Sequence, residues 1–172
     1  AVSNFLAEDL LLQSDSRQQA GGKTTPNPDL KVREALDRAS EKVAPRFKDQ
    51  PLTEAAVRFV VASSYNGVGD YAKAAVHFAR SAELRKDALG AEHDDTLQAL
   101  HRLANSYSSL GKHTEAAALH AKNLEVRQRL HGPEHSDTVA SMAMLALSYQ
   151  GQGKYAEAAA LGAQVLAILM RV

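Results

Sequence analysis

Histidine and aspartate recur together at two places in the sequence, in a pattern whose side chains could bind a metal ion. His93 lies two residues before Asp95, His135 lies two residues before Asp137, and a glutamate directly precedes each histidine. Imidazole and carboxylate groups are both common zinc ligands. The two pairs are one whole repeat of the sequence apart, so we do not expect them to converge on one ion. We expect a structural role instead, with the aspartates as helix N-caps and the histidines packed on the loops.

The remaining histidines show no such partner pattern: His77, His101, His113, His120 and His131. The sequence also lacks a Gly-x-Ser-x-Gly nucleophile elbow, a His-Glu-x-x-His zinc motif and a glycine-rich phosphate loop. We therefore predict no catalytic residues, no metal site and no cofactor in this chain.

The overall charge narrows the class of partner. Twenty basic residues balance twenty acidic residues among 172, which argues against nucleic acid or an anionic membrane surface as the ligand. No apolar run is long enough to span a bilayer, and there is no cysteine. The chain begins with alanine, and we interpret it as a piece of a longer protein. The sequence leaves cytoplasmic and periplasmic locations open.

A period of about 42 residues organises most of the chain. The residue types that keep this step are tyrosine, alanine and glycine: Tyr65, Tyr107 and Tyr149; Ala62, Ala104 and Ala146; Gly69, Gly111 and Gly153; Ala74, Ala116 and Ala158. Self-similarity at a fixed period of this length is typical of stacked repeats. We predict an all-α fold, a superhelical array of antiparallel helix pairs.

The middle copy of the repeat predicts two helices and their ends. Apolar residues recur at helical spacing over 97–107, and Gly111 follows as a residue able to take the left-handed conformation. A second apolar stripe runs over 116–130, and Gly132-Pro133 stops it. Small residues such as Ala104 and Ala116 allow the two helices to approach closely.

The first 51 residues differ from the rest. We predict a short helix over 4–13, a polar linker over 14–29 and a helix over 29–43 that Asp29 caps and Pro45 limits. This last helix lies about one period before the second helix of the first full repeat, as a degenerate repeat would. The expected division is residues 1–51 as the N-terminal part and residues 52–172 as three repeats.

The repeats resemble a known family. Leu100-x-x-Leu103-Ala104-x-x-Tyr107 resembles the first-helix signature of the tetratricopeptide repeat, and Ala74-x-x-x-Phe78 resembles the second-helix signature. The 42-residue step is similar to that of kinesin light chains. His120 and Gly162 depart from the signature, which usually has a large side chain there.

This resemblance implies a noncatalytic module that binds a protein or peptide in a groove lined by the first helix of each repeat. The matching positions are Phe59, Ser63, Asn66, His101, Arg102, Asn105, Ser108, Met144, Leu147 and Gln150. Arg102 and Asn105 lie three residues apart on one helix face, where they could hold a peptide carboxylate or backbone carbonyls. The alternative for each position is an ordinary solvated helix face.

A looser resemblance concerns the N-terminal part. The runs Phe5-Leu6-x-x-Asp9-Leu10-Leu11 and Asp29-Leu30-Lys31-Val32-Arg33 resemble the segment that leads into repeats at the C-terminal end of certain bacterial serine/threonine protein kinases. They also resemble segments of some membrane-linked transcriptional regulators. The resemblance implies an accessory or sensor part of a larger signalling protein. The kinase triplets His-Arg-Asp and Asp-Phe-Gly are absent from this chain.

The last helix predicts a different kind of contact. Where earlier copies carry Leu84-Arg85-Lys86 and Val126-Arg127-Gln128, the third copy has Ile168-Leu169-Met170. A terminal repeat normally has a polar outer face, so we expect either that further repeats follow in the full protein or that this helix meets a second copy and forms a homodimer. The rival to the groove-binding function is therefore a structural dimerisation or spacer segment without a groove ligand.

Overall fold

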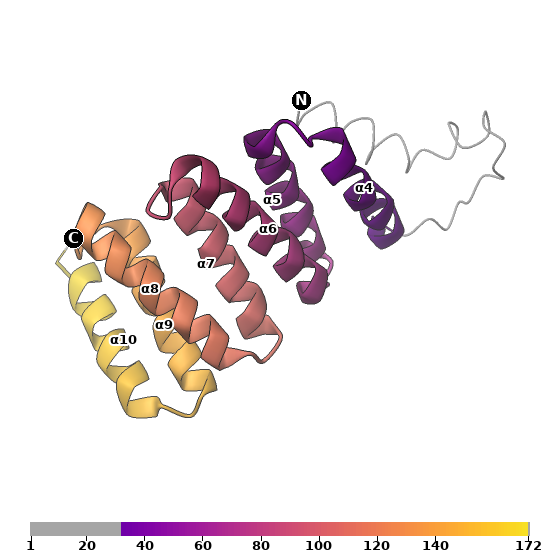
Figure 1. Ribbon diagram of the computed structural model, residues 1–172. Coiled ribbons are helices and arrows are strands. Elements are labelled where there is room, and N and C mark those ends of the chain that lie inside the picture. The colour runs from indigo at the N-terminus through magenta and orange to yellow at the C-terminus, as the bar shows by residue number, and fades with distance from the viewer. Residues whose placement is uncertain (1–31, 172) are drawn as a thin grey trace, which may run out of the picture.

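The computed structural model describes residues 32–171, and every regular element in that range is an α-helix (Figure 1). The helices are α4 (Val32–Arg46), α5 (Pro51–Gly67), α6 (Tyr71–Leu89), α7 (Asp94–Ser109), α8 (His113–His131), α9 (Ser136–Gly151) and α10 (Tyr155–Leu169). Successive helices pack side by side in an elongated stack, with α4 at one end and α10 at the other (Figure 1). This confirms the predicted all-α array of helix pairs. Within the described range, no helix is long and apolar enough to cross a membrane.

Small residues let the two helices of each pair approach closely. Ala104 on α7 and Ala116 on α8 have no exposed surface, and neither do Ala62 on α5 and Ala74 on α6. In the first pair these alanines belong to one apolar cluster that also includes Phe78. A protein interior is packed as densely as an organic crystal, so positions of this kind leave no room for a larger side chain.

A glycine turn follows the first helix of every pair. Gly69, Gly111 and Gly153 adopt φ values of 77°, 74° and 76°, which is the left-handed region that favours glycine. The N–H of Lys112, directly after Gly111, donates to the carbonyl of Tyr107 at 2.9 Å, and Lys154 donates to Tyr149 in the same way. The turn residues therefore close the last helical turn identically in successive repeats.

The N-caps of α7 and α9 are histidines, so the prediction that Asp95 and Asp137 are caps is wrong. His93 and His135 have extended backbone, and each Nδ1 accepts the N–H of the aspartate two residues on, at 3.2 and 3.3 Å. The helices begin one residue after these histidines, so each aspartate lies inside the first turn, where its charge suits the helix dipole. His135 also stacks on His131, with ring centroids 4.7 Å apart.

The helix α4 runs further than predicted, because it includes Pro45 and ends at Arg46. Proline is tolerated there since its fixed φ is helical, and the N–H of Phe47, two residues further on, still donates to the Val43 carbonyl at 3.1 Å. The helix lies in step with α6, one 42-residue period later, and packs against α5. The helix expected over 4–13, the linker over 14–29 and the cap Asp29 lie outside the described residues.

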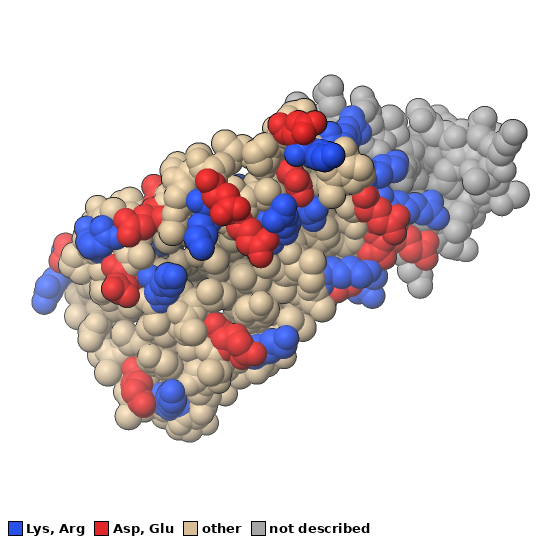
Figure 2. Space-filling model, viewed as in Figure 1, with Lys and Arg blue, Asp and Glu red and all other residues tan. Residues whose placement is uncertain are grey.

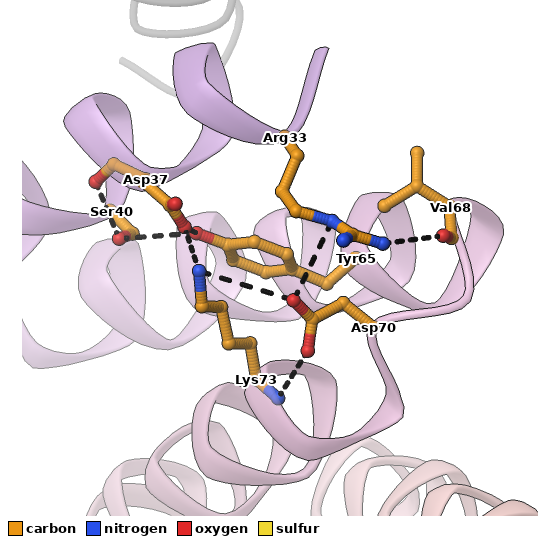
Figure 3. A network of polar contacts seen from close by, with 7 residues as sticks. All are labelled: Arg33, Asp37, Ser40, Tyr65, Val68, Asp70 and Lys73. Carbon is orange, nitrogen blue, oxygen red and sulfur yellow. Dashed lines mark hydrogen bonds and ion pairs between the residues drawn. The ribbon is translucent and has the colours of Figure 1, made fainter. Parts of the chain in front are cut away.

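A polar network fastens α4 to the first helix pair (Figure 3). The Tyr65 hydroxyl donates to Asp37 Oδ1 at 2.6 Å, and Lys73 Nζ donates to the same oxygen at 2.5 Å. Both hydrogen bonds lower the pKa of Asp37, and the one from Lys73 has the larger effect. Burial is the main cause that raises the pKa of Tyr65, so the hydroxyl stays protonated as a donor. Arg33 of α4 approaches Asp70 at 3.8 Å on the same side.

We expect Ala104→Leu to destabilise the fold by about 1–3 kcal/mol, since the added atoms have no free volume between α7 and α8. Urea unfolding followed by circular dichroism measures this change. Ala118→Leu, at an exposed position of α8, is the matched control and should leave the free energy of unfolding within about 0.5 kcal/mol. Equal stability of the two variants would contradict the assigned repeat register.

Gly111→Val should cost about 1–3 kcal/mol for a different reason, because a β-branched residue is strained at φ 74° although the space around it is open. Gly67 is the control, since it is helical and an added Cβ there also meets nothing. In thermal unfolding, the melting temperature of Gly111→Val should be clearly lower than that of Gly67→Val. The opposite order would show that the turn can adopt another conformation.

Candidate functional site

A polar hollow of about 280 Å³ lies between α7 and α9, and we name it the central hollow. Its lining residues are Asp94, Asp95, Gln98, His101 and Arg102 from α7, Arg127 from α8, and Asp137 and Ala140 from α9. It therefore sits on the first helices of neighbouring pairs. His101 and Arg102, both predicted groove residues, meet there.

Arg102 is the exposed cation of the central hollow. No hydrogen bond or ion pair engages its guanidinium within residues 32–171, so its N–H donors are available to a ligand. Asn105 lies one turn further along α7 and is half-buried. A guanidinium binds planar oxygen pairs such as carboxylates especially well, and it also donates to carbonyl oxygens.

Arg127 is the buried cation in the lining of the central hollow, and it connects α8 to α9, the first helix of the next pair. It is only 6% exposed, and it donates to the Asp137 carbonyl at 3.0 Å and to Ser141 Oγ at 2.9 Å. Its Nε has no hydrogen-bond partner among the described residues. Arg85, 42 residues earlier, likewise donates to the Asp95 carbonyl at 2.7 Å. In the sequence both arginines look like ordinary polar residues of the second helices, although their spacing equals the repeat period.

Two histidines pack together beneath the groove surface. The rings of His101 and His120 meet edge to face with centroids 5.2 Å apart, as Phe59 and Phe78 do one repeat earlier, also at 5.2 Å. His120 has no exposed surface, and neither of its ring nitrogens has a hydrogen-bond partner among the described residues. Burial is the main cause that lowers the pKa of each histidine to about 4, so both rings are neutral at pH 7.

The other predicted groove residues lie at different depths along the first helices. Phe59 is half-buried, with Arg85 over its ring at 4.8 Å, whereas Ser63 and Asn66 are exposed on α5. Ser108 and Met144 are half-buried. Leu147 and Gln150 line a separate hollow between α9 and α10. Of the predicted set, the central hollow therefore gathers only two.

The charges around the central hollow are mixed. Asp94 Oδ1 lies 2.9 Å from His131 Nε2, so these two side chains form a hydrogen bond or an ion pair. The carboxylate of Asp137 is exposed at the rim of the hollow. Both signs are also interspersed over the face of the molecule in Figure 2. A ligand with a dense run of acidic residues would meet repulsion from these carboxylates. The site suits a segment that offers carbonyl oxygens or an isolated carboxylate to Arg102.

Metal ligation finds no support in the described range. Within residues 32–171, no group of three or more histidine, cysteine, aspartate or glutamate side chains is close enough to hold an ion. His93 and His135 are engaged as N-caps.

A second hollow, of about 350 Å³, has no counterpart among the features that the sequence predicts. Residues of α6, α7 and α8 line it, and its apolar members include Leu97, Leu100, Leu119 and Val126. Thus it adjoins the second helices of two neighbouring pairs. It offers apolar contact without an unpaired guanidinium, and the central hollow remains the better candidate for polar recognition.

The buried histidine pair predicts an acid-sensitive step. Because each pKa is about 4 in the folded chain and 6.5 ordinarily, the unfolded chain binds more protons between these values, and the free energy of unfolding falls as the pH falls through them. The slope is at most about 1.4 kcal/mol per pH unit for each histidine. His101→Phe/His120→Phe, which copies Phe59 and Phe78, should flatten this dependence in urea unfolding. Parallel curves for the variant and the wild type would contradict it.

The family model for the tetratricopeptide repeat matches residues 53–122 and 95–171. No protein of curated function matches the chain. Repeats of this family generally mediate protein–protein interaction.

Solved structures agree with this match. A putative kinesin light chain from Podosopora anserina with nearly identical TPR-like repeats is similar at a TM-score of 0.72 and 24% identity, covering 98% of this chain and 89% of that chain. BtubC (BKLC) from P. vanneervenii is similar at a TM-score of 0.68 and 17% identity, covering 98% and 74%. At these identities the likeness extends to the fold. With its family model, its turn glycines and its buried alanines in agreement, the chain belongs to the tetratricopeptide repeat family.

Proposed function

We propose that this chain is a noncatalytic module that binds an extended or helical segment of another protein across the first helices of its repeats. The observation that carries this proposal is Arg102, an exposed guanidinium without a hydrogen bond or ion pair within residues 32–171, at the mouth of the central hollow. The half-buried Val60 and Met144 occupy the corresponding positions of the neighbouring repeats. A polar anchor between apolar contacts is a common basis of specific peptide recognition.

In this proposal Arg102 supplies the directional contact. Its N–H groups donate to a carbonyl or carboxylate of the ligand, and Asn105 extends the polar contact along α7. Arg127, held by Asp137 and Ser141, keeps the floor of the central hollow in place. The carboxylates at the rim select against strongly acidic segments, so the favoured ligand has mixed charge.

We place this module in a larger bacterial signalling protein. The support is the likeness of the N-terminal runs to the segment before the repeats of certain bacterial serine/threonine kinases. In such a protein the repeats would act as the accessory or sensor part.

A second role, self-association through α10, is also proposed. The observation that favours it is that no residue of α10 is buried, although the helix is largely apolar. A contact between two copies would cover this surface and leave the groove accessible.

The groove proposal can be tested by panning a random peptide phage library on the wild-type chain and measuring the selected peptides by isothermal titration calorimetry. Arg102→Ala should weaken binding by about tenfold, as the loss of hydrogen bonds to a charged group would. The free energy of unfolding should change by less than about 0.5 kcal/mol, because the site is exposed.

Arg80→Ala is the matched control, since Arg80 is exposed on α6 and pairs only with Glu83 at 3.1 Å in the described range. It should leave peptide affinity unchanged. Peptides that bind the wild type and an Arg102→Ala/Asn105→Ala variant equally well would place binding elsewhere, for example in the hollow between α6 and α8.

A further inference from the structure

The outer side of the last helix pair is an apolar surface that no part of residues 32–171 covers, and we name it the end face. A hollow of about 440 Å³ lies in it, lined by Ala143, Ala146, Leu147, Gln150, Tyr155, Ala158, Ala159, Gly162 and Val165. Leu166 is 58% exposed, Leu169 61% and Met170 78%. None of these residues carries a charge, and the surface over α9 and α10 is mostly uncharged in Figure 2. Apolar exposure on this scale marks an interaction surface.

The same face is covered one repeat earlier. Ala117 and Leu124 of α8 are buried in a cluster with Met142 and Leu145 of α9. Their counterparts 42 residues later are Ala159 and Leu166, both exposed. The end face thus has the apolar character of an internal repeat–repeat contact, and no described helix covers it.

One change sets the end face apart from an internal contact. Arg85 and Arg127 each donate to a backbone carbonyl at the start of the next first helix. The corresponding residue of the third pair is Leu169, which has no donor. At this position the end face has an apolar side chain in place of the arginine that hydrogen-bonds to the next repeat. It therefore favours an apolar partner surface over a further repeat held by that hydrogen bond.

We propose that the occupant is a second copy of this chain, with the two α10 helices packed antiparallel across a two-fold axis. The inference rests on the proposed self-association and assigns its geometry. In a two-fold contact the same patch is contributed by both copies, and a charge near the axis would meet its like. The residues lining this patch are uncharged, so no such repulsion arises.

The sizes of the side chains set the alignment of the two helices. Tyr155, Ala159, Gly162, Leu166 and Leu169 follow one another at steps of three and four residues, so they form one stripe along α10. An antiparallel pair centred between Gly162 and Leu166 brings Leu166 of one copy over Gly162 of the other. It also brings Leu169 over Ala159. A Cβ added at Gly162 would meet nothing, so the space that Leu166 needs is free.

The test is sedimentation velocity of the full chain over a series from low micromolar to millimolar concentration. The wild type should shift from monomer to dimer, and Leu166→Arg should remain monomeric where the wild type is dimeric. Gln164→Arg is the matched control, because a residue two positions away lies on another side of the helix. It should dimerise like the wild type.

The alignment itself is tested by exchanging large and small residues. Gly162→Leu should weaken dimerisation by at least about tenfold and also raise the melting temperature of the monomer, since leucine favours a helix more than glycine does. Gly162→Leu/Leu166→Ala, which restores a large residue facing a small one, should recover dimerisation.

The possible failures are distinct. A wild type that stays monomeric throughout overturns self-association and leaves the end face to another protein or repeat. A dimer that survives Leu166→Arg overturns the end face as its interface, and a dimer that the double variant does not recover overturns the antiparallel alignment. Peptide binding by monomeric Leu166→Arg reports separately on the groove.

Discussion

The structure depends on the burial of each helix pair's outer face by the pair that follows it. Leu124 is only 8% exposed because α9 covers it, whereas Leu166, at the same place in the next pair, is 58% exposed. A single pair of helices cannot bury an apolar core by itself, so stability in such arrays comes from contacts between neighbours. The described ends of the stack differ accordingly. At one end α4 packs on α5 and is fastened by Asp37, Tyr65 and Lys73, and at the other end α10 has no neighbour beyond α9.

Polar ties give these apolar contacts a fixed register. Within a pair, Ser81 donates to the Ala55 carbonyl at 2.8 Å, and Asn123 donates to that of Leu97 at 2.9 Å. Between pairs, Arg85 and Arg127 reach the start of the next first helix. Apolar packing alone tolerates small slips, but a buried donor that loses its acceptor is costly. The third pair has Val165 and Leu169 at these positions, so it has lost both kinds of tie and offers a surface of a different character.

The three pairs share one backbone plan and differ in what fills it. The position pair that holds Phe59 and Phe78 in the first pair holds His101 and His120 in the second, and Ala143 and Gly162 in the third. The interior therefore changes from aromatic to polar to nearly empty along the stack. The hollows along the first helices differ in the same way. Polar and charged residues line the one beside α7, whereas mostly apolar residues line the one between α9 and α10. A repetitive scaffold can thus present different chemistry at each step without a change of fold.

The sequence by itself determined the repeat period, the helix pairs, the turn glycines and the close-packed alanines. These features depend on local conformation and on residues that recur at one spacing, both of which are visible along the chain. It predicted Asp95 and Asp137 as caps, whereas α7 and α9 begin earlier, with His93 and His135 at the N-caps accepting the N–H groups of those aspartates. Only the tertiary structure decided that Arg127 joins two pairs, that His101 meets His120 and that Leu166 stays uncovered. Each of these outcomes depends on which side chains of different helices face one another across a contact, and that is set by how the pairs stack in three dimensions.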